Sequence, residues 1–147
     1  MQIGFTGTRE GLTPMQLSEL SLALSGAGLT QAHHGVCVGG DEQFHHRMKR
    51  DFPSVKIIGH PTINQSQMAD VKCDELMEPA EYLERNKAIV KAVHFMVACP
   101  RQKQEQLRSG TWATIRYTKQ MNNPKKLLIV IYPDGEKEMF VGQKKVL

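Results

Sequence analysis

Aromatic residues are scarce in this chain of 147 residues: Phe, Trp and Tyr together make up 6% of it, with a single tryptophan. The formal net charge is only +4, from 19 basic and 15 acidic side chains. Proteins dedicated to nucleic acids display concentrated basic faces, and those that bind single strands add aromatic stacking platforms. The composition therefore argues against a nucleic-acid partner.

Cysteine and long apolar runs are scarce as well. The three cysteines, Cys37, Cys73 and Cys99, are odd in number and form no C-x-x-C pair, which argues against a disulfide framework and is typical of a reducing compartment. No apolar run approaches the roughly 20 residues of a membrane helix, and the first residues lack the pattern of a signal peptide. We expect a soluble, cytoplasmic protein with no membrane partner.

The rest of the composition is that of an ordinary globular protein. Hydrophobic residues make up 40% of the chain and charged residues 23%, which differs from the pattern of disordered chains. A length of 147 residues corresponds to one compact unit. We therefore expect a single domain over residues 1–147 with a buried core.

Apolar runs of strand length alternate with helical patterns along the chain. Strands are predicted over residues 2–6, 32–38, 55–58, 95–98 and 127–131, and helices over 14–26, 42–50, 82–93 and 110–124. This alternation predicts a Rossmann-like, doubly wound α/β domain: a mostly parallel sheet of about five core strands, helices on both faces, and a C-terminal edge strand or hairpin near 139–141. Residues 62–79 have weak periodicity and predict a long loop, either a lid or a contact with a neighbouring subunit.

In such sheets ligands bind outside the carboxyl ends of the strands, where the strand order reverses. The loops predicted at that edge are Gly7-Thr8-Arg9, Gly39-Gly40-Asp41, Gly59-His60-Pro61, and 101–109 leading to Gly110-Thr111. Glycine beside polar or basic residues, with a helix start behind it, suits close approach of the backbone to a phosphate. The alternative for each loop is an ordinary turn or helix cap.

The strongest of these signals is Arg108-Ser109-Gly110-Thr111-Trp112. Ser109 and Thr111 can cap a helix or bond an anion, and Arg108 can add a bidentate clamp. Trp112 can stack on a base or sugar, although a lone tryptophan more often packs in the core.

Further candidates lie near the same edge. Asp41 can act as a helix cap, a ribose acceptor or an acid or base, while His34 and His60 stand near strand ends as possible ligand contacts. The adjacent histidine pairs at 33–34 and 45–46 complete no familiar metal-ligand spacing, so neither a metal nor a cofactor is predicted. Arg85-Asn86, early in a predicted helix, can face the same cleft or solvent.

Four stretches of the sequence together resemble the SLOG superfamily. They are GFTGTR (4–9), HGVCVGGD (34–41), YLERN (82–86) and RSGTW (108–112), in the family's order. This superfamily shares a Rossmann-like fold and includes the DNA-processing protein DprA, LOG-type phosphoribohydrolases and many small bacterial and phage proteins. The resemblance implies a nucleotide or nucleotide-sugar pocket with Gly110-Thr111 at the phosphate-binding helix start. It also implies a homo-oligomer in a bacterial cell or a phage-infected host.

The resemblance leaves catalysis open. LOG-type enzymes carry a catalytic glutamate shortly after their Gly-Thr pair, where this chain has Thr114, whereas Arg85 resembles the arginine of their other motif. A carboxylate that stabilises a ribosyl cation would have to be another residue, with Asp41 and Glu84 as candidates.

Three hypotheses follow. The leading one is a binding protein for a nucleotide-derived molecule, with an ADP-ribose or NAD-related signal favoured, acting as a sensor or as a phage anti-defence sponge. The second is a nucleotide N-glycosidase, and the third, from the similarity to DprA, is single-stranded DNA binding. The predicted ligand contacts are Gly7, Thr8, Arg9, His34, Gly39, Gly40, Asp41, His60, Arg85, Asn86, Arg108, Ser109, Gly110, Thr111 and Trp112.

Overall fold

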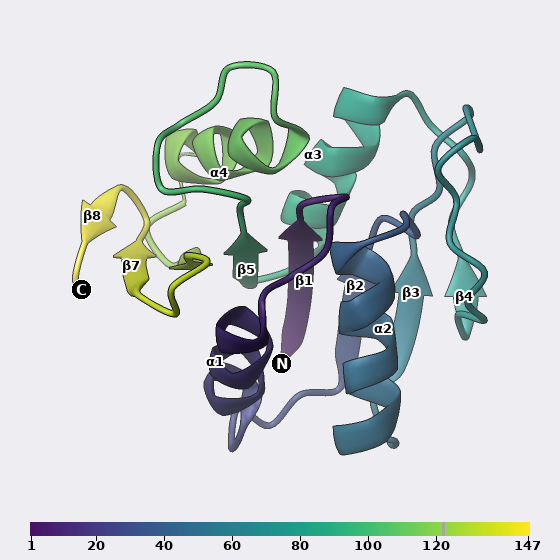
Figure 1. Ribbon diagram of the computed structural model, residues 1–147, viewed down its shortest axis with the longest axis horizontal. Helices are drawn as coiled ribbons and strands as arrows, with labels where there is room; N and C mark the ends of the chain where they lie inside the picture. The colour runs from purple at the N-terminus through teal and green to yellow at the C-terminus, as the bar shows by residue number, and fades with distance from the viewer. Residues whose placement is uncertain (122) are drawn as a thin grey trace.

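A single sheet with helices on both faces organises the protein in the computed structural model, which describes residues 1–121 and 123–147 (Figure 1). In chain order the elements of this described part are β1 (Gln2–Gly7), α1 (Pro14–Leu24), β2 (Gln31–His34), α2 (Gly40–Asp51), β3 (Lys56–Gly59), β4 (Glu75–Leu76), α3 (Tyr82–Ala92), β5 (Phe95–Cys99), α4 (Gly110–Gln120), β6 (Leu127–Ile131), β7 (Lys137–Val141) and β8 (Lys144–Lys145).

The strand order is β4-β3-β2-β1-β5-β6-β7-β8. The first six strands in this order, from β4 through β1 to β6, are parallel to their neighbours. Strands β7 and β8 add an antiparallel hairpin at one edge. The chain runs outward from β1 to β4 and then returns to β5 on the other side of β1. The switch point therefore lies between β1 and β5, whose arrowheads point toward the same set of loops in Figure 1.

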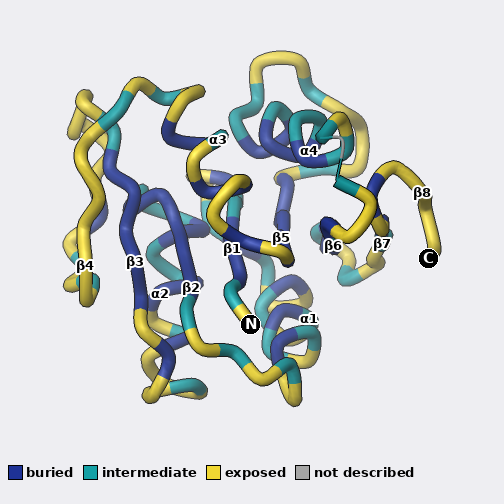
Figure 2. Tube along the Cα trace, turned by 180° about the vertical axis from the view of Figure 1, so that it is seen from behind, coloured by how far each residue is buried: buried dark blue, intermediate teal, exposed yellow. Residues whose placement is uncertain are grey.

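Two hydrophobic clusters cover the two faces of the sheet. One cluster joins the central strands to α1 and α2, and the other joins them to α3 and α4. Strand β5 shows why its run is apolar throughout: Val97 belongs to the first cluster, while its neighbours Met96 and Ala98 belong to the second. Side chains alternate between faces along a strand, so a strand covered on both sides is hydrophobic at every position. Figure 2 shows this burial in the central strands, with β4 and β8 exposed at the edges.

The α/β class, the mostly parallel sheet and the C-terminal hairpin are confirmed. Several boundaries are shifted by one or two residues, and three larger differences from expectation stand out. The strand expected over 32–38 ends at His34, because Val36 adopts a left-handed backbone conformation with φ of 56° and turns the chain out of the sheet. The loop expected over 62–79 contains the short strand β4, which the weak local pattern did not indicate. Helix α4 ends at Gln120, earlier than predicted, and Asn122 of the predicted end lies outside the described residues. No helix in the described part of the chain is long and apolar enough to cross a membrane.

Candidate ligand-binding cleft

Three adjoining cavities form a cleft at the carboxyl edge of the sheet, and all three are lined by Arg9 and Tyr82. The largest, of about 360 Å³, we call the basic pocket. The second, of about 280 Å³, we call the amide pocket. The third, of about 30 Å³, lies over the sheet and is called the floor. Tyr82 is within cation–π distance of two guanidinium groups, that of Arg9 at 5.4 Å and that of Arg85 at 5.2 Å.

The basic pocket is built between the loop after β1 and the loop before α4. Its charged members are Arg9, Arg101 and Arg108, against the single carboxylate of Glu10. Glu10 accepts a hydrogen bond from the Thr8 hydroxyl and lies 3.4 Å from Arg101. Three guanidinium groups around one carboxylate leave an excess of positive charge, which suits an anionic group.

The N-terminus of α4 forms one wall of the basic pocket. Ser109 is the N-cap, and its hydroxyl accepts a hydrogen bond from Trp112 N at 3.2 Å, so the predicted cap is present. Thr111 is buried and lines both the basic pocket and the floor. A side chain at Gly110 would overlap the hydroxyl of Tyr82. Glycine at 110 therefore lets the Tyr82 ring lie against the start of α4, a reason that the sequence did not provide.

Asp41 and Arg85 form the buried polar part of the floor, with 7% and 4% of their surface exposed. The Nη1 of Arg85 donates to the carbonyl oxygens of Gly35 at 2.6 Å and His60 at 3.0 Å, and its Nε donates to Asn86 Oδ1 at 2.8 Å. These neutral acceptors fix the guanidinium in place, and the nearby carboxylate of Asp41 offsets part of its charge. A fixed buried cation beside an open cavity suits a negatively charged or electron-rich ligand group.

The carboxylate of Asp41 is perturbed by its surroundings. Its Oδ2 accepts a hydrogen bond from Cys37 N at 3.2 Å. Burial raises the pKa of Asp41 to about 6, although the nearby Arg85 guanidinium opposes the rise. A carboxyl group with a pKa near neutrality in a cleft is typical of functional sites.

The loop that presents Asp41 is strained at Val36. A positive φ is unfavourable for a β-branched residue and costs about 1–3 kcal/mol. Two hydrogen bonds hold it: Val36 N donates to His34 Nδ1 at 3.0 Å, and Val36 O accepts from Ala69 N at 2.8 Å. Such strain clusters at ligand sites, where surrounding contacts can maintain it.

Gly39 and Gly40 bring the loop before α2 into contact with the loop after β1. A side chain at Gly39, which has φ of 86°, would overlap the carbonyl of Arg9, and Gly40 N donates to Thr8 O at 2.9 Å. Close backbone approach was expected toward a ligand at Gly39 and Gly40. In the structure the approach is toward the neighbouring loop. Gly7, in contrast, lines both the basic pocket and the floor.

Several predicted site residues lie away from the cleft lining. Trp112 is buried in the core, where its ring lies 6.4 Å from that of Tyr132, because it points from α4 toward the sheet. Glu84 is exposed on α3 and lies 3.8 Å from Lys87. His34 and His60 are buried beneath the loops, where His60 contributes its carbonyl to Arg85.

Other cleft residues were not selected from the sequence. Tyr82 belongs to the YLERN stretch but was not among the predicted ligand contacts, yet it lines all three cavities. Its position three residues before Arg85 on one helix was the available signal. Cys37 was not among the predicted ligand contacts, although it lines two of the cavities. Residues 62–67 were expected only as part of a lid or subunit contact, and several of them line the second cavity.

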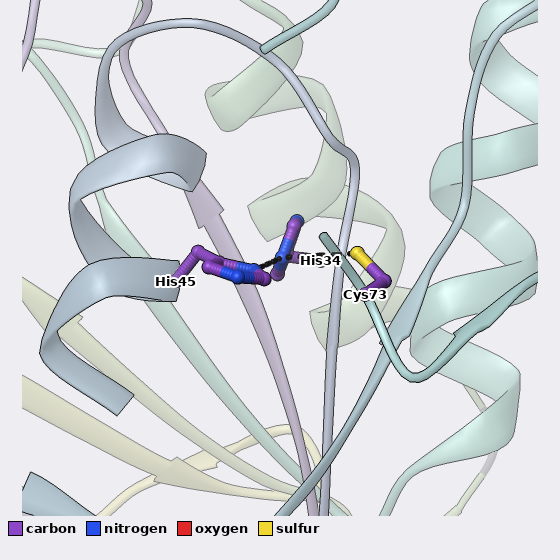
Figure 3. Close-up of side chains that lie close together, drawn as sticks. All are labelled: His34, His45 and Cys73. Atoms are coloured by element: carbon purple, nitrogen blue, oxygen red, sulfur yellow. Dashed lines mark hydrogen bonds between the residues drawn. The ribbon is translucent and has the colours of Figure 1, made fainter. Parts of the chain in front are cut away.

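A separate cluster of possible metal ligands lies under the loop after β2 (Figure 3). His34 Nε2 is 2.9 Å from His45 Nδ1 and 3.9 Å from Cys73 Sγ. Because His34 Nδ1 accepts a hydrogen bond from Val36 N, the neutral ring carries its proton on Nε2 and donates it to His45. A metal would need the lone pair of that nitrogen, so this arrangement does not fit one. Burial lowers the pKa of His34 to about 3, which keeps the ring neutral.

The fold and the cleft define a class of protein: an α/β protein with a mostly parallel, doubly wound sheet and a polar cleft at its switch point. A scan against protein-family models finds no match, and a search of curated proteins finds no similar sequence. Among solved structures, the molybdenum cofactor binding protein from the phototrophic bacterium Rippkaea orientalis is similar, with a TM-score of 0.64 and 20% identity over 89% of this chain and 76% of that chain. At this identity the similarity shows the fold alone.

Proposed function

We propose that the protein binds a nucleotide-derived small molecule in the cleft, with an ADP-ribose or NAD-related signal favoured, and acts as a sensor or a sequestering sponge. The observation that carries the proposal is the basic pocket, where Arg9, Arg101 and Arg108 surround the N-terminus of α4 at the switch point. Guanidinium groups and helix N-termini both favour phosphate oxygens.

Two further observations support a small-molecule ligand. The similar fold from Rippkaea orientalis belongs to a protein that binds a molybdenum cofactor. In addition, the stretches 4–9, 34–41, 82–86 and 108–112, which resemble the SLOG superfamily, all contribute residues to the lining of the cleft. Membership of that superfamily, assembly into a homo-oligomer and a role in phage anti-defence are part of the same proposal.

The experiment begins with ligand capture. The protein purified from its native or infected host is denatured, and released small molecules are identified by mass spectrometry. Titration calorimetry then measures binding of the identified compound, together with NAD and ADP-ribose. Arg108→Ala should weaken binding by about tenfold or more, since it removes a charge-assisted contact.

A charge-matched control is available. Arg50 lies exposed near the C-terminal end of α2 and pairs with Asp51 at 2.7 Å, away from the cleft residues. Arg50→Ala removes the same charge and should leave the affinity unchanged. Equal losses in both variants, or no binding by the wild type, would contradict the proposal.

A nucleotide N-glycosidase is the second candidate, and Asp41 is the observation in its favour. The floor is lined by Thr114, whose hydroxyl donates to Gly110 O at 3.0 Å, at the position where LOG-type enzymes carry a glutamate. Among the described residues that line the floor, Asp41 is the one carboxylate able to stabilise a ribosyl cation. Release of free base from a nucleotide, lost in Asp41→Asn, would establish this activity and exclude a simple sponge.

A further inference from the structure

The two large pockets of the cleft differ in chemistry. The basic pocket carries an excess of positive charge, whereas the charged members of the amide pocket are the shared Arg9 and the carboxylate of Glu81. The other lining residues of the amide pocket are uncharged: Thr62 and Ser66 carry hydroxyls, of which that of Thr62 donates to Asn64 O at 2.6 Å, Asn64 and Gln67 carry amides, and Ile63 is among the apolar residues. A phosphate would meet Glu81 in the amide pocket, so the basic pocket is the favoured site for the anion.

The wall of the amide pocket is fixed by backbone hydrogen bonds at both ends. Ile63 N donates to Ala80 O at 3.0 Å, which ties the segment to the start of α3. Val38 N donates to Gln67 O at 2.9 Å, which ties it to the loop after β2. This part of the loop that was expected to be a lid or a subunit contact therefore forms a hydrogen-bonded wall of the amide pocket. It belongs to the stretch between β3 and β4 (Figure 1).

The side chains on this wall offer both hydrogen bonds and an apolar surface. Asn64 Oδ1 accepts from Ser66 N at 3.0 Å, an Asx turn that orients the Asn64 amide. Gln67, whose backbone is held by Val38, is also a lining residue of the pocket and carries a side-chain amide. The Ile63 side chain is 59% exposed and, like the Tyr82 ring, lines the pocket. Together they offer an apolar surface against which a flat ligand group can pack.

From this chemistry we infer that the amide pocket binds the uncharged heterocyclic base of a nucleotide whose phosphate lies in the basic pocket. Carboxamides present a donor and an acceptor together, which matches the edge of a base, and apolar side chains match its flat face. One molecule can occupy both pockets because they meet at Arg9 and Tyr82. The sugar would then lie over the floor, beside Asp41. The inference rests on the proposed function and specifies which end of the ligand lies where.

The test compares ligands with and without a base. Titration calorimetry measures the dissociation constants of ribose 5-phosphate, AMP, GMP, CMP, UMP and ADP-ribose for the wild type, Gln67→Ala and Gln65→Ala. Gln65 is a matched control, because it is exposed, lies two residues away and is outside the amide pocket. Ile63→Ala serves as a second variant on an exposed side chain.

We expect at least one base-containing ligand to bind about tenfold or more tightly than ribose 5-phosphate. Gln67→Ala should weaken the binding of that ligand by about five- to tenfold and leave the affinity for ribose 5-phosphate unchanged. Ile63→Ala should change the two affinities in the same way. Gln65→Ala should change neither.

Two negative results are distinguishable. If ribose 5-phosphate binds as well as every base-containing ligand, or if Gln67→Ala and Gln65→Ala behave alike, the base subsite is wrong and the proposed function stands. If none of the six compounds binds the wild type, the proposed function fails and the base subsite fails with it.

Discussion

Replacing Asp41 with asparagine removes a buried charge while keeping the shape of the side chain. Asp41 is 7% exposed, and its Oδ2 accepts a hydrogen bond from Cys37 N at 3.2 Å. The amide oxygen of asparagine can accept the same bond. The substitution therefore isolates the effect of the negative charge on stability.

The magnitude follows from the perturbed pKa. Burial raises the pKa of Asp41 from 3.8 to about 6 even though Arg85 is close. A rise of about two pKa units corresponds to about 3 kcal/mol at pH 8, by which ionised Asp41 lowers the free energy of unfolding. The folded state binds the proton more tightly than the unfolded chain, so this destabilisation is full above about pH 6 and absent below about pH 4.

We expect Asp41→Asn to raise the free energy of unfolding by about 2–3 kcal/mol at pH 8 and to have little effect near pH 4. Urea unfolding at both pH values, with unchanged denaturant dependence, measures the difference. Asp70→Asn is the control, since Asp70 is exposed and its replacement should change stability by less than about 0.5 kcal/mol. A destabilised Asp41→Asn at pH 8, or a gain that persists at pH 4, would refute the reasoning.

The result bears on function as well as on stability. A residue that destabilises the fold needs a reason outside the fold, and ligand binding or catalysis is the usual one. The same variant therefore enters the base-release assay. Stabilisation accompanied by loss of base release would identify Asp41 as a catalytic residue, and stabilisation with unchanged ligand affinity and no turnover would remove it from the site.

Two further predictions concern backbone geometry and acid stability. Gly39→Ala should lower the free energy of unfolding by about 2 kcal/mol or more beyond Gly26→Ala in urea titrations: both residues have positive φ, but the space around Gly26 is open, whereas a Cβ at Gly39 overlaps a neighbouring carbonyl. Similar losses in the two variants would contradict the overlap. Burial lowers the pKa of His34 to about 3 and of His60 to about 4, so the folded state binds fewer protons than the unfolded chain below about pH 6.5. Between pH 7 and pH 5 we expect a net loss of about 2–3 kcal/mol, because about 2 kcal/mol from each histidine is partly offset by protonation of Asp41. Unfolding titrations that show equal or greater stability at pH 5 would refute this.

Local patterns were sufficient for most of the elements. The start of α1 carries local signals of this kind: Thr13 is the N-cap, Pro14 is the first helical residue, and Thr13 forms a capping box with Gln16. The apolar runs of β1, β5 and β6 form the centre of the sheet, and the predicted switch-point loops carry the basic pocket. These features depend on residues a few positions apart, which is the range over which hydrogen-bond caps and side-chain periodicity act.

The composition of the cleft depended on tertiary contacts. Tyr82 lies at the junction of the three cavities because α3, which follows β4 in the chain, packs beside α4 on one face of the sheet. Gln67 becomes a wall residue through a backbone bond to Val38, and Arg85 is fixed by carbonyls from two other loops. No local propensity encodes such pairings, because they follow from the order of the strands.

The sequence by itself thus determined the α/β class, most of the helices and strands, and the edge of the sheet where polar loops gather. Only the tertiary structure decided which of those polar residues share a cavity, that Trp112 packs in the core, and that the pKa of Asp41 is raised. The physical reason is that periodicity and capping are properties of neighbouring residues, whereas burial and its electrostatic consequences are properties of the assembled fold.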